Sequence, residues 1–172
     1  MKVLQRIGLF GITGLLAVHT TAQSSGNVCQ VVEDSHNHTT LYEAIKTTDL
    51  TKTLTDAGPY TIFAPSNEAF TQLPAGDWEG LKHSESKQEL TKFLSYHIVS
   101  GKYDEQALRD AIKKGNGSVK LRTIAGGKLT FRLVDDSIVL TDGKGNDTAI
   151  GATDMDATNG VVHSIDSVLL KK

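Results

Sequence analysis

The chain has 172 residues, of which 38% are hydrophobic, and a formal net charge of −2. This length suits one domain with a hydrophobic core of its own. Without Lys2 and Arg6 near the N-terminus, 16 basic residues stand against 20 acidic ones, which gives a net charge of −4. No basic stripe is evident and there is one tryptophan, so the composition argues against nucleic acid as a partner.

The N-terminus has the pattern of a secretory signal peptide. A basic start at residues 1–6 precedes an apolar run at residues 7–18 and small residues up to Ala22. The apolar run is closer to signal-peptide length than to the length of a membrane-spanning helix, although an uncleaved anchor is the alternative. We therefore expect a secreted protein, periplasmic or extracellular, with no membrane span after cleavage. Its expected parts are the signal peptide at 1–22, a polar leader at 23–27 and one domain at 28–172.

The chain has one cysteine, Cys29, and therefore cannot form an internal disulfide. An exported domain of this kind must be held together by its hydrophobic core. We expect Cys29 to remain an unpaired thiol in a monomer. A dimer linked through Cys29 is the alternative.

Helical patterns dominate the first half of the domain. Thr40 and Glu43 have the spacing of a capping box, which predicts a helix start followed by an apolar face. Ser86 and Glu89 repeat this spacing before a second helix. Asp104 is placed to cap a third helix, whose last turn is basic, as the helix dipole favours.

A short strand interrupts these helices. Residues 60–64 are rich in β-branched and aromatic residues and end at Pro65, which predicts a strand. Ser66 then lies where a helix N-cap is expected, with residues 67–70 as the first turn.

After Gly117 the pattern changes to the alternation of apolar and polar residues that is typical of strands. Turn signals separate these strands, and the pair Asn159-Gly160, which favours a tight turn with positive φ angles, opens the last one. Helices followed by a β-meander predict an α+β fold in which the early helices pack on the sheets. The strands are expected around residues 119–121, 129–133, 138–140, 149–150 and 161–169.

Three segments of the chain belong together: residues 58–70 (GPYTIFAPSNEAF), residues 96–101 (YHIVSG) and residues 159–166 (NGVVHSID). Together they resemble the fasciclin family, and they stand in the order that the family has them. The resemblance covers these segments and the sequence between them, which is nearly all of the expected domain. The residues that we assign to the structural motif are Phe63, Pro65, Ser66, Phe70, Asn159, Gly160, His163 and Asp166.

The resemblance implies a wedge of two β-sheets with helices packed on one side, the helices mainly in the N-terminal half and the meander in the C-terminal half. It also implies a role in extracellular adhesion or matrix interaction, because the family is not known chiefly for catalysis. We expect no enzymatic activity and no cofactor. With one domain and a short leader, the chain looks like the small secreted single-domain members found in bacteria.

Tyr96 and His97 form the Tyr-His block, which the resemblance links to adhesion. One interpretation is that they shape an interaction surface. The other is that both lie on the inner face of the helix end and that the imidazole hydrogen-bonds to the backbone, because buried Tyr and His need satisfied polar groups.

His163 lies between Val161 and Ile165 on the apolar face of the last strand, which favours a neutral, buried, structural imidazole over a ligand or a catalyst. A hydrolytic triad could be composed from Ser66, a histidine and Asp166. However, Ser66 is explained as a helix cap, and no Gly-x-Ser-x-Gly elbow surrounds it. The sequence therefore predicts no catalytic residues.

Two weaker patterns concern metals. His36 and His38 would share one face of an extended segment and could hold zinc or copper, but no third ligand is fixed beside them. Residues 142–147 begin like a calcium loop, yet lack its glycine and its glutamate, which favours a hairpin turn. We predict no metal site, with His36 and His38 as weak candidates.

These observations predict a non-enzymatic adhesion or matrix module that binds a protein or polysaccharide of the cell envelope. The alternative is a binding protein for a small or hydrophobic ligand. That alternative requires a cavity lined by Phe63, Phe93 and Phe131, whereas an exposed apolar patch would favour a protein partner.

Overall fold

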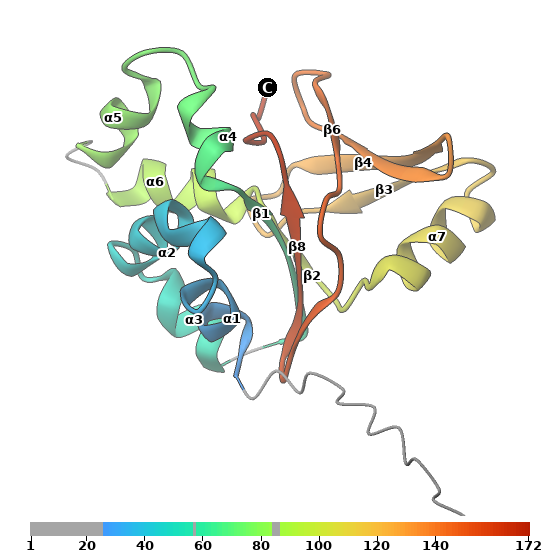
Figure 1. Cartoon of the computed structure of the whole chain (residues 1–172), viewed down its shortest axis with the longest axis horizontal. Coiled ribbons are helices and arrows are strands. Elements are labelled where there is room, and N and C mark those ends of the chain that lie inside the picture. The colour runs from blue at the N-terminus through green and yellow to red at the C-terminus, as the bar shows by residue number, and fades with distance from the viewer. Residues whose placement is uncertain (1–25, 57, 84–86) are drawn as a thin grey trace, which may run out of the picture.

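The computed structural model describes residues 26–56, 58–83 and 87–172, and these residues form a mixed helix and strand fold (Figure 1). The expected signal peptide at 1–22 lies outside the described residues. In the described part of the chain, no helix has both the length and the apolar character needed to cross a membrane. The helices are α1 (Val28–Glu33), the 3-10 helix η1 (His36–His38), α2 (Thr39–Lys46), α3 (Leu50–Asp56), α4 (Asn67–Thr71), α5 (Asp77–Lys82), α6 (Lys87–Ser95) and α7 (Glu105–Lys114).

The strands form two four-stranded sheets, as the resemblance implied. The first sheet has the order β2-β1-β8-β7, and its centre is the parallel pair of β1 and β8. The second sheet is the meander β3-β4-β5-β6. The strands are β1 (Tyr60–Pro65), β2 (Ile98–Ser100), β3 (Ser118–Arg122), β4 (Lys128–Val134), β5 (Ser137–Thr141), β6 (Asp147–Ala149), β7 (Met155–Ala157) and β8 (Gly160–Ile165).

The first sheet is covered on both faces. Helices α1 to α6 lie on one side of it, and the second sheet and α7 lie on the other (Figure 1). Ile62 and Val162 therefore pack in the helix layer, whereas Phe63 and Ile165 pack between the sheets. Consequently β8 is buried on both faces, although its sequence has the alternation of apolar and polar residues that predicts one exposed face.

The pair Asn159-Gly160 does not have the positive φ angles that were predicted for it. Gly160 is the first residue of β8, and it is not among the described residues with positive φ. A Cβ atom there would lie 1.9 Å from the carbonyl oxygen of Tyr60, so glycine lets β1 and β8 approach. Asn159 accepts a hydrogen bond from Val28 N–H at 2.8 Å and donates one to the carbonyl oxygen of Leu54 at 2.7 Å. The pair therefore joins α1, α3 and β1 to the last strand.

Two of the predicted helix caps are confirmed, and one is wrong. Ser66 accepts a hydrogen bond from Ala69 N–H, and Asp104 accepts one from Ala107 N–H. By contrast, Thr40 lies inside the first turn of α2, where its N–H donates to the side chain of Asn67 at 2.9 Å. The capping group for α2 therefore comes from another helix. The predicted box at Ser86 lies outside the described residues.

The sequence patterns also missed two short helices, α1 and α5. The side chain of Asn27 caps α1, and the carbonyl oxygen of Gly26 accepts a hydrogen bond from Thr158 N–H at 3.0 Å. The end of the expected leader is therefore part of the folded domain.

Candidate functional site

Three of the described histidines are buried, and each joins segments that are distant in the sequence. His38, His97 and His163 are at most 2% exposed. Each ring uses both nitrogens in hydrogen bonds. Because burial disfavours the charged imidazolium, the pKa of each histidine is lowered.

Tyr96 and His97 do not form a surface, which corrects the first interpretation of this pair. Each is 1% exposed. The Tyr96 hydroxyl donates to the carbonyl oxygen of Lys128 at 3.2 Å. Nε2 of His97 accepts from Leu169 N–H at 3.0 Å, so Nδ1 carries the proton and donates to the carbonyl oxygen of Phe93 at 3.0 Å. Burial lowers the pKa of His97 to about 4, and the neutral ring ties α6 to the C-terminal segment.

His163 on β8 is fully buried. Its Nδ1 accepts from Asp154 N–H at 3.3 Å, so Nε2 carries the proton and donates to the carbonyl oxygen of Tyr103 at 2.7 Å. The ring stacks on Phe63 with centroids 5.6 Å apart. Asp154 has a left-handed φ of 56°, a conformation that Asp tolerates better than most residues. With both nitrogens bound to backbone groups, the imidazole is a connector and has no free nitrogen for proton transfer.

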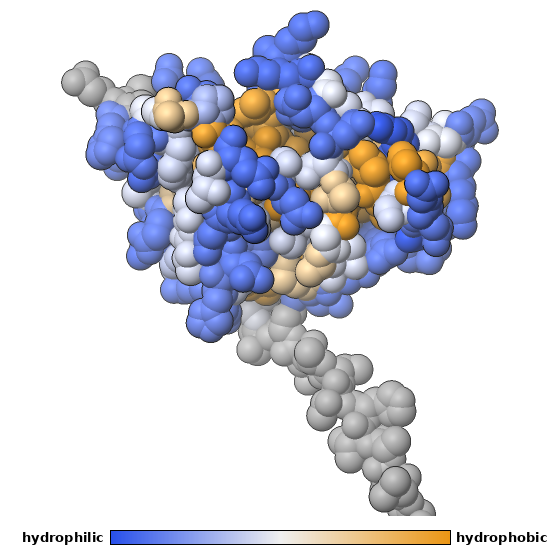
Figure 2. Space-filling model, turned by 45° about the horizontal axis from the view of Figure 1, so that its top comes forward, coloured by the Kyte–Doolittle hydropathy of each residue, from blue (hydrophilic) through white to orange (hydrophobic). Residues whose placement is uncertain are grey.

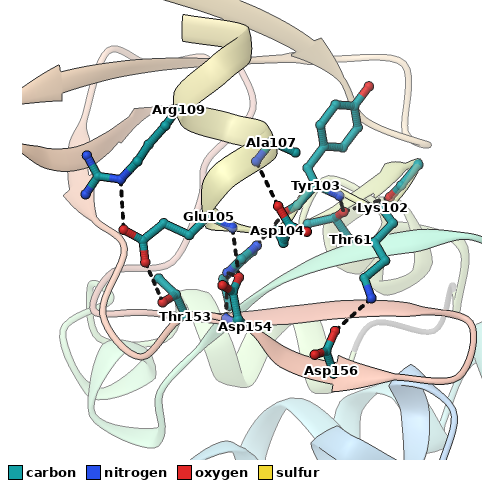
Figure 3. Close-up of polar contacts among 12 residues, drawn as sticks. Thr61, Lys102, Tyr103, Asp104, Glu105, Ala107, Arg109, Thr153, Asp154 and Asp156 are labelled. Atoms are coloured by element: carbon teal, nitrogen blue, oxygen red, sulfur yellow. Dashed lines mark hydrogen bonds and ion pairs between the residues drawn. The ribbon is translucent and has the colours of Figure 1, made fainter.

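A polar network lies at the start of α7 (Figure 3). Thr61 accepts a hydrogen bond from Tyr103 N–H at 2.9 Å, which fixes the loop before α7 to β1. Asp154 then accepts from Glu105 N–H at 2.8 Å, so the segment before β7 meets the first turn of α7. A charged pair at 2.7 Å, Lys102 with Asp156, borders the same loop and raises the pKa of the lysine.

Glu105 extends this network toward the second sheet. Its carboxylate accepts from Arg109 Nε at 2.9 Å and from the Thr153 hydroxyl at 2.9 Å (Figure 3). The bond from Arg109, followed by the bond from Thr153, lowers the pKa of Glu105. Arg109 also binds the Asp136 carboxylate at 3.0 Å. The network therefore joins α7 to the β4–β5 turn. Sequence reasoning missed it, because its partners come from three separate loops and no spacing marks them.

His36 and His38 are not on one face of an extended segment. They lie in η1, where His36 is exposed and His38 is buried. Nδ1 of His38 is 2.8 Å from the Ser35 hydroxyl, and Nε2 is 3.0 Å from the Ser164 hydroxyl. Within the described ranges no group of three or more His, Cys, Asp or Glu side chains could hold a metal ion.

The segment that resembled a calcium loop is a hairpin turn between β5 and β6. Asp142 is 7% exposed and holds this turn from inside. Its carboxylate accepts from the N–H groups of Lys144 and Asn146 and from Leu170 N–H, at 2.8–3.0 Å. The carboxylate thereby fastens the C-terminal segment to the second sheet.

The cavity that the small-ligand alternative requires is not formed by Phe63, Phe93 and Phe131. Phe63 and Phe131 are fully buried and pack on each other with centroids 5.1 Å apart. Phe93 lies in the helix layer beside Trp78.

A groove of about 400 Å³ does occur between α2, α5 and α6. Trp78 and Leu90 provide apolar lining, and Glu43 and Lys82 provide charge. The Trp78 ring packs on Phe70 with centroids 4.5 Å apart. The groove has the size of a small-ligand site.

Comparison with known proteins gives consistent matches. The family model described as Fasciclin domain matches residues 36–171. Protein sll1483 of Synechocystis sp. is 37% identical over 147 residues, which cover 86% of this chain and 74% of that protein. Transforming growth factor-beta-induced protein ig-h3 of Sus scrofa is 35% identical over 144 residues, which cover 84% of this chain but 19% of the relative.

Immunogenic protein MPB70 of Mycobacterium bovis is 32% identical over 120 residues, covering 67% of this chain and 51% of that protein. Among solved structures, a FAS1 domain pair from the insect cell adhesion molecule Fasciclin I matches with a TM-score of 0.60 and 24% identity. The match covers 76% of this chain and 44% of that chain, and it concerns the fold.

Proposed function

The chain belongs to the fasciclin domain family, and from this membership we propose that it is a secreted, non-enzymatic adhesion module. Its proposed partner is a protein or polysaccharide of the cell envelope or matrix. Support comes from the insect cell adhesion molecule Fasciclin I, whose domains share the fold of this chain. The signal-peptide pattern of residues 1–22 supports export.

One observation carries this proposal: the polar groups of the motif residues are used inside the fold. The Tyr96 hydroxyl and the imidazoles of His97 and His163 all bind backbone groups. Ser66, the serine of the hypothetical triad, caps α4. Such residues build a scaffold, so a partner must be recognised by the exposed surface.

Saturable binding to the envelope fraction of the host tests the proposal. The labelled chain should bind this fraction, and an excess of unlabelled folded chain should compete. The same chain, denatured and alkylated at Cys29, should not compete. Binding that is non-saturable, or that the denatured chain displaces equally well, would contradict the proposal.

The groove beside Trp78 supports a second candidate function, the binding of a small amphiphile. Its volume of about 400 Å³ and its mixed lining fit such a ligand. Trp78 is the only tryptophan of the chain, so tryptophan fluorescence reports on the surroundings of this one side chain, which lines the groove. Titration with a short-chain fatty acid should shift the emission in a saturable way, and Leu90→Glu should abolish the shift. An unchanged emission spectrum over the whole titration would exclude amphiphiles of this kind.

A further inference from the structure

The outer face of the second sheet carries a cluster of cations that the linear sequence conceals. Lys120 and Arg122 lie on β3, and Lys128 lies on β4. The side chains of a strand alternate, so Lys120 and Arg122 share one face, about 7 Å apart along β3. Arg122 is the direct cross-strand partner of Lys128. All three are exposed, whereas Leu121 and Leu129 between them are buried. We call Lys120, Arg122 and Lys128 the basic corner.

The charge of the basic corner is not balanced locally. No ion pair or side-chain hydrogen bond joins any of the three cations to another described residue. Residues 111–134 contain no Asp or Glu. On the same face, Arg132 is compensated: it binds the Asp147 carboxylate at 3.0 Å, and this lowers the pKa of Asp147 to about 2. The sheet therefore holds one neutralised cation and three free ones.

This arrangement has an energetic cost for the fold. Like charges directly opposite each other on antiparallel strands are destabilising, and Arg122 faces Lys128 in register. A local rule that is broken without compensation inside the fold is characteristic of functional surfaces. An anionic partner would remove this repulsion.

We propose that the basic corner binds an acidic polysaccharide, an extended polymer that carries carboxylate or sulfate groups. This proposal rests on the proposed function and specifies the partner class and the surface. The neighbouring outward side chains Ser118 and Thr130 carry hydroxyl groups, which can hydrogen-bond sugar hydroxyls. Figure 2, in which the top of Figure 1 is turned by 45° toward the viewer, shows hydrophilic and apolar areas side by side on this face of the molecule.

The small number of cations in the basic corner and the negative net charge of the chain favour a narrow polymer over a membrane or a nucleic acid. The chain as a whole is acidic, with a net charge of −2, so a broad anionic surface would also meet repulsive groups. A single polymer can follow the basic corner alone. No aromatic residue occurs on the outward positions of β3 and β4, so stacking platforms for nucleic-acid bases are missing on these strands. Two large apolar side chains of the described residues are exposed, Ile124 at the hairpin tip at 37% and Val134 at the end of β4 at 42%, which is little for membrane insertion.

Binding to immobilised alginate, a polyuronate, tests the proposal, with neutral dextran as the reference polymer. The chain should bind alginate at low salt and release it at high salt, because exposed charges are screened. The variant K120Q/R122Q/K128Q should bind alginate on the order of tenfold more weakly. The matched variant K52Q/K87Q/K92Q removes three exposed lysines from α3 and α6 and should bind like the parent. Circular dichroism should show both variants folded.

The remaining outcomes separate the inference from the function on which it rests. Equal binding to dextran, or equal losses in both variants, would overturn the assignment to the basic corner. Tighter binding to phosphatidylglycerol vesicles or to double-stranded DNA than to alginate would refute an acidic polysaccharide as the partner. If the K120Q/R122Q/K128Q variant still binds the envelope fraction like the parent, this inference fails while the adhesion proposal stands. If the parent does not bind that fraction, the adhesion proposal fails by itself.

Discussion

At the scale of single residues, the buried histidines explain why the family blocks contain polar groups. A neutral imidazole offers one donor and one acceptor, so it can join two backbone segments in the interior. His97 does this between α6 and Leu169, and His163 does it between the loop before α7 and Asp154. The sequence indicated an inner, structural histidine at 163. It could not indicate the partners, because backbone groups of distant loops leave no mark in the residue pattern.

Replacing His163 should destabilise the fold. His163→Ala leaves the carbonyl oxygen of Tyr103 and the N–H of Asp154 without their partner and removes a ring packed on Phe63. We expect the free energy of unfolding in urea to fall by about 1–3 kcal/mol. His36→Ala, at an exposed site, should change it by less than about 0.5 kcal/mol. Equal stability of the two variants would refute the structural role of His163.

Stability should decrease as the pH falls below the ordinary histidine pKa. The pKa values of His38, His97 and His163 are lowered in the fold, so the unfolded chain binds protons first, near pH 6.5. The stabilisation is therefore complete above about pH 7 and is lost on acidification. Each histidine contributes up to about 1.4 kcal/mol per pH unit, and for His97 this continues down to its pKa of about 4.

Urea unfolding between neutral pH and about pH 5 measures this slope. His97→Gln should reduce it by roughly one proton, because one of the titrating groups is removed. His36→Ala, an exposed control, should leave it unchanged. A slope that is the same in all three proteins would show that the buried histidines do not control the acid sensitivity.

At the scale of elements, the helix starts show where sequence reasoning succeeds and where it fails. Ser66 and Asp104 cap their own helices, so the signal is local and the prediction was confirmed. The cap of α2 comes from Asn67, which is distant from Thr40 in the sequence. The apparent box of Thr40 and Glu43 is therefore a coincidence of spacing. Only the tertiary fold brings the true capping group into place.

Asn67→Ala should weaken the fold through α2. The Asn67 carboxamide accepts from Thr40 N–H at 2.9 Å and from the Thr39 hydroxyl at 3.2 Å, and it donates to the carbonyl oxygen of His36 at 3.0 Å. Loss of this cap should cost about 0.5–2 kcal/mol in thermal or urea unfolding. Glu43→Ala, which tests the predicted box, should cost less than about 0.5 kcal/mol. If Glu43→Ala destabilised the fold more than Asn67→Ala, the cap of α2 would be the local box of Thr40 and Glu43 after all.

At the scale of the whole molecule, the α+β class, the two sheets and the meander were predictable from periodicity and from the three family blocks. The pairing of β8 with β1 was not, because a parallel pair between distant segments leaves only apolar strands as its signal. The basic corner was hidden for a similar reason. Its cations alternate with apolar residues, and only the register of β3 and β4 brings Arg122 opposite Lys128.

The packing of α1 has a consequence for the oligomeric state. Cys29 is 5% exposed, and burial, followed by the nearby Glu33 carboxylate, raises the pKa of its thiol. The thiol should therefore react with Ellman's reagent orders of magnitude more slowly in the folded chain than in urea. The chain should also migrate as a monomer without reductant. Rapid labelling of the folded protein, or a disulfide-linked dimer, would contradict this packing of α1.

The central claim is that the motif residues hold the fold and that an exposed cationic surface binds the partner. Parallel measurement of unfolding free energy and alginate binding in His163→Ala and K120Q/R122Q/K128Q tests it most directly, at a temperature where both variants are folded. We predict that His163→Ala loses stability and keeps its affinity for alginate. The triple variant should be at least as stable as the parent, because the repulsion between Arg122 and Lys128 is removed, and it should bind alginate on the order of tenfold more weakly. A folded His163→Ala chain that no longer binds alginate would contradict the account, because the motif would then belong to the binding site.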